Sequence, residues 1–303
     1  MRTDLDRLTT RGKHALGWRV EAARWRARRA TSSLRLRPSF LLIGAQKAGT
    51  SSLHDYLAEH PAVLCGVPKE IRYFNRFYVY GEGWYRAHFP LVARAAVARR
   101  RTGARPAVGE GSASYLFHPL VPERVHTYDP TMKLIPVVRD PVDRAYSHYQ
   151  MEVRWGRETL SFEDALAREE RELGAELERL RANPLDTSPS WLNCSYVARG
   201  RYAEQLERWL ELFPREQLLV LTSDELLADP AEIMLRVADF LELPRWQAER
   251  YPLRGVREYS PMPPETRERL ARVFEPHNRK LEDLLDRKLE WTRPAASVPS
   301  GRG

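Results

Sequence analysis

The stretch LLIGAQKAGTSS, residues 41–52, has the residue types of an anion-binding loop. Gly44 and Gly49 separate an apolar run from a segment with helical periodicity. In the common nucleotide-binding loop, G-x-x-x-x-G-K-[ST], the lysine follows the second glycine and the hydroxyl residue serves Mg²⁺. Here Lys47 precedes Gly49 by two positions, and Thr50 follows the glycine directly. A strand that enters a helix through such a loop directs backbone N–H groups and the Lys47 charge at an anion.

A second candidate segment, KLIPVVRDPVDRAYSHY at residues 133–149, begins with a later apolar run. Arg139 comes where that run ends, and open α/β sheets bind ligands at the carboxyl ends of their strands. Asp140 suits the N-cap of the next helix and Pro141 its first position, with Ser147 two turns further on. Taken alone, these residues are explained equally well by a capped helix with Arg139 in a structural ion pair.

The same two segments bear on the use of a metal. A Walker-type site places an aspartate after an apolar strand, where it helps to hold Mg²⁺. Here the run LIPVV is followed first by Arg139 and only then by Asp140. Together with the displaced Lys47, this order predicts a phosphate-like ligand held by protein cations, without a metal.

Apolar runs and helical periodicity predict the elements that position these segments. Apolar runs typical of buried parallel strands occur at residues 39–44, 62–65, 107–110, 132–138 and 217–222. Segments with helical character lie between and after them, at residues 50–60, 121–128, 141–156, 161–180, 196–214, 231–243 and 263–285. Thr50 or Ser51 is expected to cap the first of these helices. The alternation predicts an α/β fold with a central parallel sheet flanked by helices.

Composition is that of a globular protein, and the cysteine content favours a reducing compartment. It has 303 residues, of which 43% are hydrophobic and 30% are charged, as is ordinary for a globular domain. No apolar run approaches the ~18 residues needed to cross a bilayer, and the N-terminus lacks the apolar core of a secretory signal. Cys65 and Cys194 are too few for a disulfide framework or a zinc site. We therefore expect a cytoplasmic protein.

Residues 1–38 form a basic extension before an expected domain at 39–293 and a tail at 294–303. The stretch RGKHALGWRVEAARWRARRATSSLRLRP would suit an amphipathic helix lying on a partner or peripherally on the inner face of a membrane. A frayed tail or a helix packed on the domain explains it more simply, and we favour that interpretation. The net charge of +8 suits anionic ligands, although a GC-rich genome explains the arginines as well. We expect no nucleic-acid partner.

GAQKAGTSSL and RDPVDRAYSHY together resemble the two donor-binding segments of sulfotransferases that use 3′-phosphoadenosine 5′-phosphosulfate (PAPS). The chain is most similar to the carbohydrate branch, the heparan sulfate N- and O-sulfotransferases and their bacterial relatives. The resemblance covers roughly residues 39–291 and includes KEIRYFN at 69–75. It implies a P-loop-like three-layer fold and transfer of a sulfuryl group from PAPS to an acceptor hydroxyl, or less readily an amine. The acceptor would be a glycan, glycolipid or small molecule, the product would be adenosine 3′,5′-bisphosphate (PAP), and no metal would be needed.

The resemblance also implies roles for individual residues. Arg139 and Ser147 would bind the 3′-phosphate that distinguishes PAPS from ordinary nucleotides. Glu70 matches the glutamate that acts as base in the glycan O-sulfotransferases, and Lys47 would face the bridging oxygen, so these two are the predicted catalytic residues. The loop that would hold the 5′-phosphosulfate comprises Gly44, Gln46, Lys47, Ala48, Gly49, Thr50, Ser51 and Ser52.

Other positions match the family less clearly. Tyr202 begins a helix near the expected donor site, where it would either contact the 3′-phosphate or only cap the helix. In the late donor loop, Arg257 is the better match to a family cation and Arg254 the alternative. Many members carry a lysine after the third strand, whereas this chain has Gly111 there. One cation of the acceptor pocket is therefore missing or comes from elsewhere.

Two further questions stay open in the sequence. His118 is the rival candidate for the base, because the intrinsic pKa of histidine suits proton transfer near neutrality. Four large aromatic residues have flat faces that would suit an acceptor groove, although such residues are more often core. They are Trp84, Tyr85, Trp155 and Trp191.

Two other functions are consistent with parts of the sequence. A small-molecule kinase with a variant loop would bind ATP and need Mg²⁺. A non-enzymatic basic module would bind nucleic acid or vesicles through residues 1–38 and surface arginines, with a steep dependence on salt.

Overall fold

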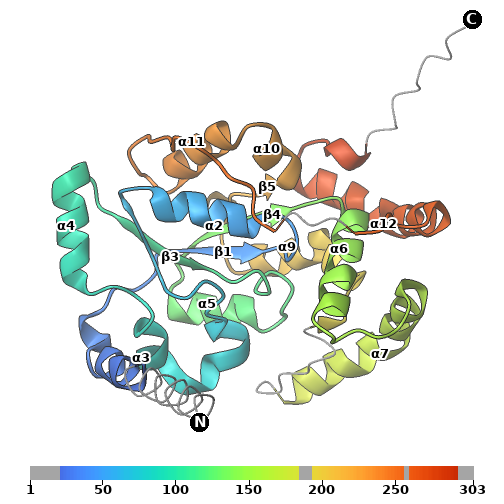
Figure 1. Cartoon of the computed structure of the whole chain (residues 1–303), viewed down its shortest axis with the longest axis horizontal. Helices are drawn as coiled ribbons and strands as arrows, with labels where there is room; N and C mark the ends of the chain where they lie inside the picture. The colour runs from blue at the N-terminus through green and yellow to red at the C-terminus, as the bar shows by residue number, and fades with distance from the viewer. Residues whose placement is uncertain (1–20, 184–192, 256–258, 293–303) are drawn as a thin grey trace, which may run out of the picture.

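The computed structural model describes residues 21–183, 193–255 and 259–292. Its centre is a five-stranded parallel sheet with the strand order β2-β3-β1-β4-β5, which confirms the predicted α/β fold (Figure 1). The strands are β1 (Phe40–Gly44), β2 (Val63–Cys65), β3 (Ala107–Gly111), β4 (Lys133–Val138) and β5 (Leu221–Thr222).

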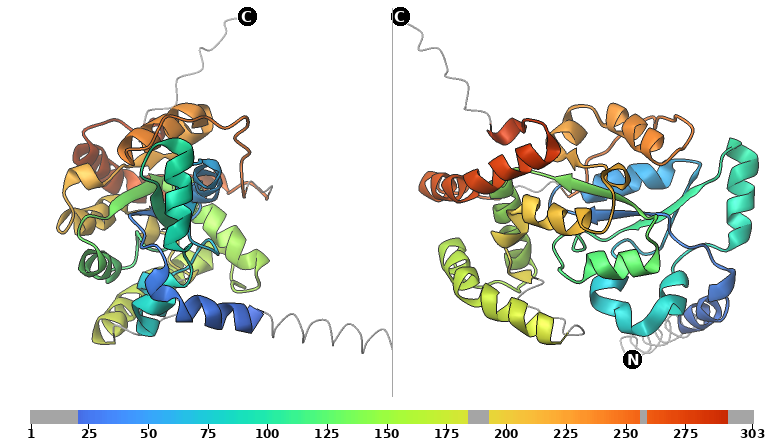
Figure 2. Two further views of the ribbon diagram at one scale, coloured as in Figure 1. Left: turned by 90° about the vertical axis from the view of Figure 1, so that its left-hand side faces the viewer. Right: turned by 180° about the vertical axis from the view of Figure 1, so that it is seen from behind.

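Helices cover both faces of the sheet. The chain runs from β1 outward to β2, returns through β3, and then crosses β1 to reach β4 and β5. Because parallel crossovers are right-handed, this reversal puts α2 on one face and α5 and α9 on the other (Figures 1 and 2). The helices are α2 (Thr50–Glu59), α3 (Gly81–Arg86), α4 (Val92–Thr102), α5 (Val121–Tyr128), α6 (Pro141–Arg154), α7 (Phe162–Ala182), α9 (Tyr202–Leu210), α10 (Ser223–Ala228), α11 (Pro230–Phe240) and α12 (Pro264–Leu285).

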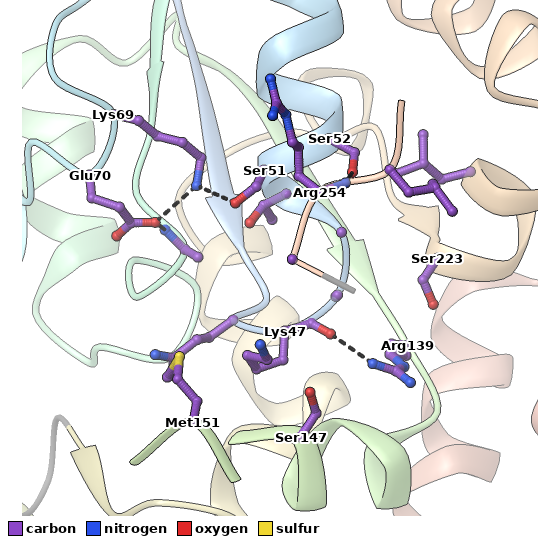
Figure 3. A pocket seen from close by; sticks show the side chains of 18 of the residues that line it. Lys47, Ser51, Ser52, Lys69, Glu70, Arg139, Ser147, Met151, Ser223 and Arg254 are labelled. Atoms are coloured by element: carbon purple, nitrogen blue, oxygen red, sulfur yellow. Dashed lines mark hydrogen bonds and ion pairs between the residues drawn. The ribbon is translucent and has the colours of Figure 1, made fainter. Parts of the chain in front are cut away.

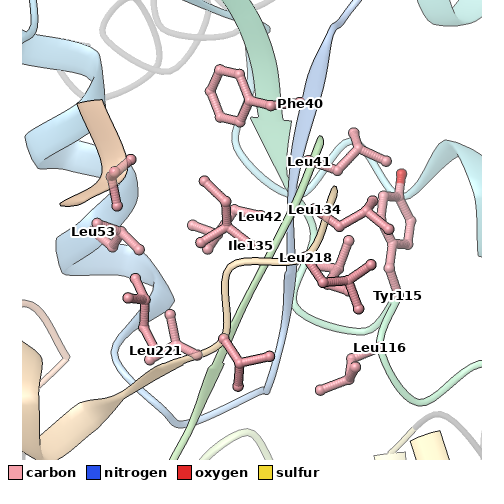
Figure 4. Packing of buried hydrophobic residues seen from close by; sticks show 14 of the residues in the cluster. Phe40, Leu41, Leu42, Leu53, Tyr115, Leu116, Leu134, Ile135, Leu218 and Leu221 are labelled. Atoms are coloured by element: carbon pink, nitrogen blue, oxygen red, sulfur yellow. The ribbon is translucent and has the colours of Figure 1, made fainter. Parts of the chain in front are cut away.

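Strand β1 lies at the centre of the core. Phe40, Leu41, Leu42 and Ile43 are each at most 1% exposed, as expected for a strand with neighbours on both edges and helices on both faces. Leu53 of α2 packs on one side of the sheet and Tyr115 lies on the other (Figure 4). The β1–β4 register shifts between Leu42 and Gly44, so the strand becomes irregular where the loop begins.

The N-caps of α6 and α2 test two predictions made from the sequence. Asp140 does cap α6, since its Oδ1 accepts hydrogen bonds from the backbone N–H groups of Val142 (2.8 Å) and Asp143 (3.4 Å). The cap predicted for α2 is wrong. Gly49 occupies the N-cap with φ of 96°, and Thr50 is already helical. A left-handed N-cap strongly favours glycine, which leaves the Thr50 and Ser51 hydroxyls available to the loop.

Part of the N-terminal extension packs on the domain. Residues 21–30 form a helix, and Trp25 packs against Trp84 and His88, with ring centroids 5.9 and 4.7 Å apart. Arg28 Nε donates a hydrogen bond to the carbonyl of Ala87 over 2.6 Å. Residues 1–20 of the extension and the predicted tail at 294–303 lie outside the described residues.

Candidate active site

A cavity of about 590 Å³ opens at the carboxyl ends of the central strands. It brings together the loop after β1, the segment after β2, the loop after β3 and one face of α6 (Figure 3). This is where the strand order reverses, which is the usual ligand site of an open α/β sheet. The sequence-predicted residues that line it are Gln46, Lys47, Ala48, Gly49, Thr50, Ser51, Ser52, Glu70, Arg139, Ser147, Trp155 and Arg254.

The loop after β1 has the form of an anion cradle. Lys47 has a φ of 72° and Gly49 a φ of 96°, so the backbone turns twice through the left-handed region before α2 begins. The first N–H groups of α2 have no acceptor within the helix, and they favour an anion at its N-terminus. Gln46 Oε1 is buried without a hydrogen-bond partner among the described residues. The cradle thus presents donors and one buried polar atom that a ligand would satisfy.

Gly44 shapes this loop without lining the cavity. A Cβ at this position would lie 2.8 Å from the carbonyl oxygen of Ala113 and 2.9 Å from Leu116 Cβ, and its φ is 149°. Only glycine allows the end of β1 to pass so close to the loop after β3. The role of Gly44 is therefore to bring the two loops together.

Arg139 is fixed at the opposite side of the cavity from Glu70 (Figure 3). Its Nη1 donates to the carbonyl of Lys47 over 3.3 Å, and its own carbonyl accepts a hydrogen bond from the Tyr202 hydroxyl over 3.0 Å. Tyr202 is buried and lies outside the cavity lining. Its hydroxyl therefore positions the Arg139 backbone, which neither sequence alternative for Tyr202 foresaw. Ser147 lines the cavity from α6, beside Arg139.

Glu70 is held by three donors. Its carboxylate accepts hydrogen bonds from Arg72 Nε (3.2 Å), Lys69 Nζ (3.4 Å) and the backbone N–H of Ala113 (3.1 Å). Its side chain is 26% exposed and its φ is 62°, a conformation that costs a residue other than glycine roughly 1–3 kcal/mol. The Glu70 backbone N–H donates to the carbonyl of Gly111 over 2.9 Å, which anchors this conformation to the end of β3.

Lys69 links the carboxylate to the anion cradle. Its Nζ lies 3.2 Å from Ser51 Oγ and 3.4 Å from Glu70 Oε1, so one ammonium group contacts both (Figure 3). In the sequence, neither Lys69 nor Arg72 stands out as a site residue. The structure shows that both also line the cavity and make its Glu70 side cationic.

A second carboxylate lies beneath this side of the cavity. Glu110 is 1% exposed and accepts hydrogen bonds from the hydroxyls of Tyr115 (2.7 Å) and Ser112 (2.8 Å). Burial raises the pKa of Glu110 to about 7, the nearby Glu70 charge adds to this, and the two hydroxyls oppose it. Ser112 Oγ also accepts the backbone N–H of Arg72 over 3.0 Å, so Glu110 supports the segment that carries Glu70.

The position of the family lysine is tightly packed. A Cβ at Gly111 would lie 3.3 Å from His54 Cδ2 and 3.4 Å from Leu42 Cδ2, so a side chain here would need His54 to shift by a few tenths of an ångström. The cation that the family resemblance implies at this position is absent from the strand. Lys69 and Arg72 bring positive charge to the same side of the cavity from the preceding segment.

Of the two late arginines, Arg254 is described and Arg257 lies outside the described residues. The Arg254 backbone N–H donates to Ser52 Oγ over 2.8 Å, which fastens the late loop to the anion cradle. Its guanidinium forms an ion pair with Asp55 over 2.7 Å and points away from Lys47 (Figure 3). Arg254 therefore contributes its backbone to the site more directly than its charge.

Three other sequence candidates lie outside the cavity lining. His118 is 2% exposed, and its Nδ1 accepts the backbone N–H of Leu120, so it is not placed to meet an acceptor. Burial and nearby arginines lower the pKa of His118 to about 3, which further disqualifies it as a base near neutrality. Trp84 and Tyr85 belong to an aromatic cluster around Tyr73, and Trp191 lies outside the described residues.

One face of α6 runs along the cavity. Ser147, Met151 and Trp155 all line it, and their spacing of four residues puts them on one side of the helix and its C-cap. Trp155 is 50% exposed, and the Arg157 guanidinium lies 4.1 Å from the centroid of its ring. Met151 was missed in the sequence, although its position one turn after Ser147 was a sufficient signal.

No group of three or more His, Cys, Asp or Glu side chains among the described residues is placed to hold a metal ion. No helix within residues 21–183, 193–255 and 259–292 is long and apolar enough to cross a membrane.

The chain is similar to several known sulfotransferases. The chain is 34% identical to the mouse heparan sulfate glucosamine 3-O-sulfotransferase 3B1 over 69% of this chain and 47% of the relative. It is 25% identical to the membrane-associated sulfotransferase kil1 of Dictyostelium discoideum, over 84% of this chain and 66% of the relative. The chain thus matches less than two thirds of the length of either.

A solved structure and a family model extend these matches. The crystal structure of a sulfotransferase from Alicyclobacillus acidocaldarius aligns with a TM-score of 0.63 and 34% identity, over 85% of this chain and all of that one. The family model described as the sulfotransferase domain matches residues 37–252 of the 303. This range includes the anion cradle, Glu70, Arg139 and Ser147. The chain belongs to the sulfotransferase domain family.

Proposed function

We propose that the protein transfers a sulfuryl group from PAPS to a hydroxyl group of an acceptor, with release of PAP. One observation carries this proposal: a single cavity contains an anion cradle with Lys47, an Arg139–Ser147 pair and a carboxylate, Glu70. The anion cradle and the Arg139–Ser147 pair suit the two anionic ends of the donor. Glu70 suits the role of the base that takes the proton from the hydroxyl group of the acceptor.

The residues of the cavity fit PAPS as a donor. Loop residues 46–52 offer backbone N–H groups, hydroxyls and the Lys47 charge to the 5′-phosphosulfate. Arg139 and Ser147 offer a guanidinium and a hydroxyl to the 3′-phosphate. The unpartnered Gln46 Oε1 in the cradle suits a ligand donor, such as a ribose hydroxyl.

Glu70 and Lys47 divide the work of the transfer. PAPS supplies the activated sulfuryl group. Glu70 accepts the proton of the attacking hydroxyl, and Lys47 stabilises the negative charge that grows on the departing phosphate. Lys69 contacts both Glu70 and the cradle residue Ser51, and we propose that it supplies the cation missing at position 111.

We propose a glycan or glycolipid as the acceptor, with an amine acceptor less favoured than a hydroxyl. The name of the mouse relative, a heparan sulfate glucosamine 3-O-sulfotransferase, supports a sugar hydroxyl. The exposed ring of Trp155 at the cavity wall offers a flat apolar face of the kind that sugars pack against.

We propose the cytoplasm as the compartment, since Cys65 and Cys194 are both free. Peripheral contact with the inner membrane face through residues 1–38 is a further proposal. It is supported by the basic composition of that segment and by the name of the relative kil1, a membrane-associated sulfotransferase.

The donor is tested by comparing PAP with AMP. PAP should raise the melting temperature well above the effect of AMP, because only PAP carries the 3′-phosphate. At a hundredfold excess over the dissociation constant, the stabilisation should be about 2.7 kcal/mol. Arg139→Ala should remove the difference between the two ligands. Equal shifts in the unaltered protein would overturn the assignment.

A chelator separates this function from the kinase alternative. Sulfuryl transfer from PAPS should continue in EDTA, because the cations that face the donor are protein side chains. A complete loss of activity that Mg²⁺ restores would favour the kinase. Tighter calorimetric binding of MgATP than of PAP would lead to the same conclusion.

A further inference from the structure

Helix α4 stands apart at one edge of the molecule. Of its eleven residues, only Ala98 is buried, with Ala95 and Thr102 half-buried on the same side. The opposite side consists of exposed residues, including Val97 at 42% and Arg100. A helix with so little contact with the core gains little stability from packing. Its outward face is available to a partner.

The charged residues of α4 and of the segments beside it are all arginines. Residues 83–109 contain no aspartate or glutamate. Among the described residues, none of the five arginines in and just after α4 has an ion-pair partner, and all five are exposed. They are Arg94, Arg99, Arg100, Arg101 and Arg105.

Apolar side chains are exposed among these arginines. Val92 is 50% exposed and Leu91 is 41% exposed at the start of α4. Leu34 is 58% exposed on the neighbouring segment, which meets α4 through the bridge between Arg35 and Leu91. A purely polar helix face would have no exposed Leu or Val side chains, and a face that packs on the core would have no exposed arginines.

The helix at residues 21–30 extends the same surface. Trp25 and Arg28 fix it to the domain, which leaves Arg24, Arg26 and Arg29 exposed. With the edge of the molecule turned to the viewer, α4 stands in front and this helix lies below it (Figure 2, left). The nearest acids along the chain are Glu21, at the start of this helix, and Glu82 and Glu110 on either side of α4. Glu82 already pairs with Arg37 and Arg86, and Glu110 is buried.

We propose that this surface, formed by α4 with Leu34, Leu91 and the helix at 21–30, docks on an anionic lipid membrane. The arginines match lipid phosphates, and the exposed Leu and Val side chains can enter the headgroup region between them. Nucleic acid would use the arginines but would gain nothing from the apolar side chains. The combination therefore favours a membrane.

Docking in this way leaves the cavity accessible. Helix α4 leads into the amino end of β3, whereas the cavity opens at the carboxyl ends of the strands. Helix α4 and the carboxyl end of β1 lie toward opposite ends of the sheet (Figure 1). The bound enzyme would take its donor and acceptor from the solvent side.

The test is co-sedimentation of the full chain with vesicles of phosphatidylcholine, with and without phosphatidylglycerol. Binding should require the anionic lipid and should fall in high salt. Each arginine near an anionic surface strengthens binding about fivefold. Arg99, Arg100 and Arg101 changed together to Gln should therefore weaken binding about a hundredfold. The matched control changes Arg171, Arg250 and Arg272 to Gln, which removes the same charge from exposed sites elsewhere and should change binding little.

A second variant separates a membrane from nucleic acid. Val92→Ser with Val97→Ser keeps every charge and should weaken vesicle binding. The proposal is overturned if the unaltered chain does not bind anionic vesicles, or if the control triple variant loses binding as much as the α4 variant. It is also overturned if the serine variant binds vesicles unchanged while duplex DNA binds more tightly than vesicles. PAP binding should be the same in all variants, so this result is independent of the proposed transferase activity.

Discussion

The backbone N–H of Ala113 donates a hydrogen bond to Glu70 Oε1 over 3.1 Å. Ala113 belongs to the loop after β3, so this bond ties the proposed base to the central sheet. A group positioned in advance needs little reorganisation when it accepts a proton. The contact therefore makes the role of Glu70 testable by a substitution that keeps the bond.

Glu70→Gln should abolish proton acceptance while an oxygen remains for the Ala113 N–H. Turnover should fall by roughly 10²–10⁴, as is typical for a lost general base, while PAP affinity stays nearly unchanged. Initial rates and a PAP titration of the same preparation measure both quantities. If Glu70→Gln turns over normally and His118→Ala is inactive, the base is His118 despite its place outside the cavity lining.

Lys47→Ala should have a different profile. Because Lys47 is proposed to act on the leaving phosphate, its loss should slow transfer to every acceptor and weaken PAP binding somewhat. Arg250→Ala is the matched control, since it removes one positive charge from an exposed site outside the cavity lining. A Lys47→Ala defect that appears with only some acceptors would contradict a role at the leaving group.

Glu110 should make stability depend on pH. Its pKa in the folded protein is about 7, above the usual 4.5, so the folded state holds its proton more tightly than the unfolded chain. Stability from this group is therefore complete below about pH 4.5 and is lost as the pH rises through 7. The loss is about 3 kcal/mol at most.

Glu110→Gln isolates this effect. The variant should gain in melting temperature relative to the unaltered protein as the pH rises from 5 to 8, because a neutral amide has no proton to lose. Asp239→Asn, which removes an exposed ion pair with Arg245, is a control that should show no such gain in melting temperature between pH 5 and 8. Parallel curves for Glu110→Gln and the unaltered protein would show that Glu110 is not the titrating group.

Trp155 is expected to contact the acceptor and not the donor. Trp155→Ala should raise the acceptor KM about fivefold, equivalent to about 1 kcal/mol of lost apolar contact, with PAP affinity unchanged. Trp155→Phe should restore most of the loss, because it keeps a flat face. A weaker affinity for PAP in Trp155→Ala would place this ring on the donor side.

The central strands and the two donor segments were predictable, because continuous apolar runs and glycine-rich turns are local signals. The fold prediction is confirmed on that basis. Short elements were harder to foresee. Helix α10 has six residues, and the π-helical and 3-10 turns at Tyr73–Phe77 and Tyr78–Tyr80 have no period long enough to detect.

Within the site, the sequence identified most of the loop after β1 together with Glu70, Arg139 and Ser147, but missed Lys69, Arg72 and Met151 and did not indicate how each side chain is directed. Tyr202 was expected near the donor, yet its hydroxyl contacts the Arg139 backbone from beneath. The Arg254 guanidinium pairs with Asp55, which is 199 positions away along the chain. The direction of such side chains depends on contacts between segments that are distant along the chain, and no local sequence pattern indicates these contacts.

The placement of β1 between β3 and β4 divides the lining of the cavity into two groups that come from different stretches of the chain. Glu70, Lys69 and Arg72 lie in the segment between β2 and β3, whereas Arg139, Ser147 and Trp155 follow β4, at and beyond its end and along α6. The loop after β1 lies between the two groups. A graft of residues 66–80 from a relative would therefore exchange the proposed proton acceptor and its cations, while Arg139 and Ser147, the proposed anchor for the donor 3′-phosphate, stayed in place.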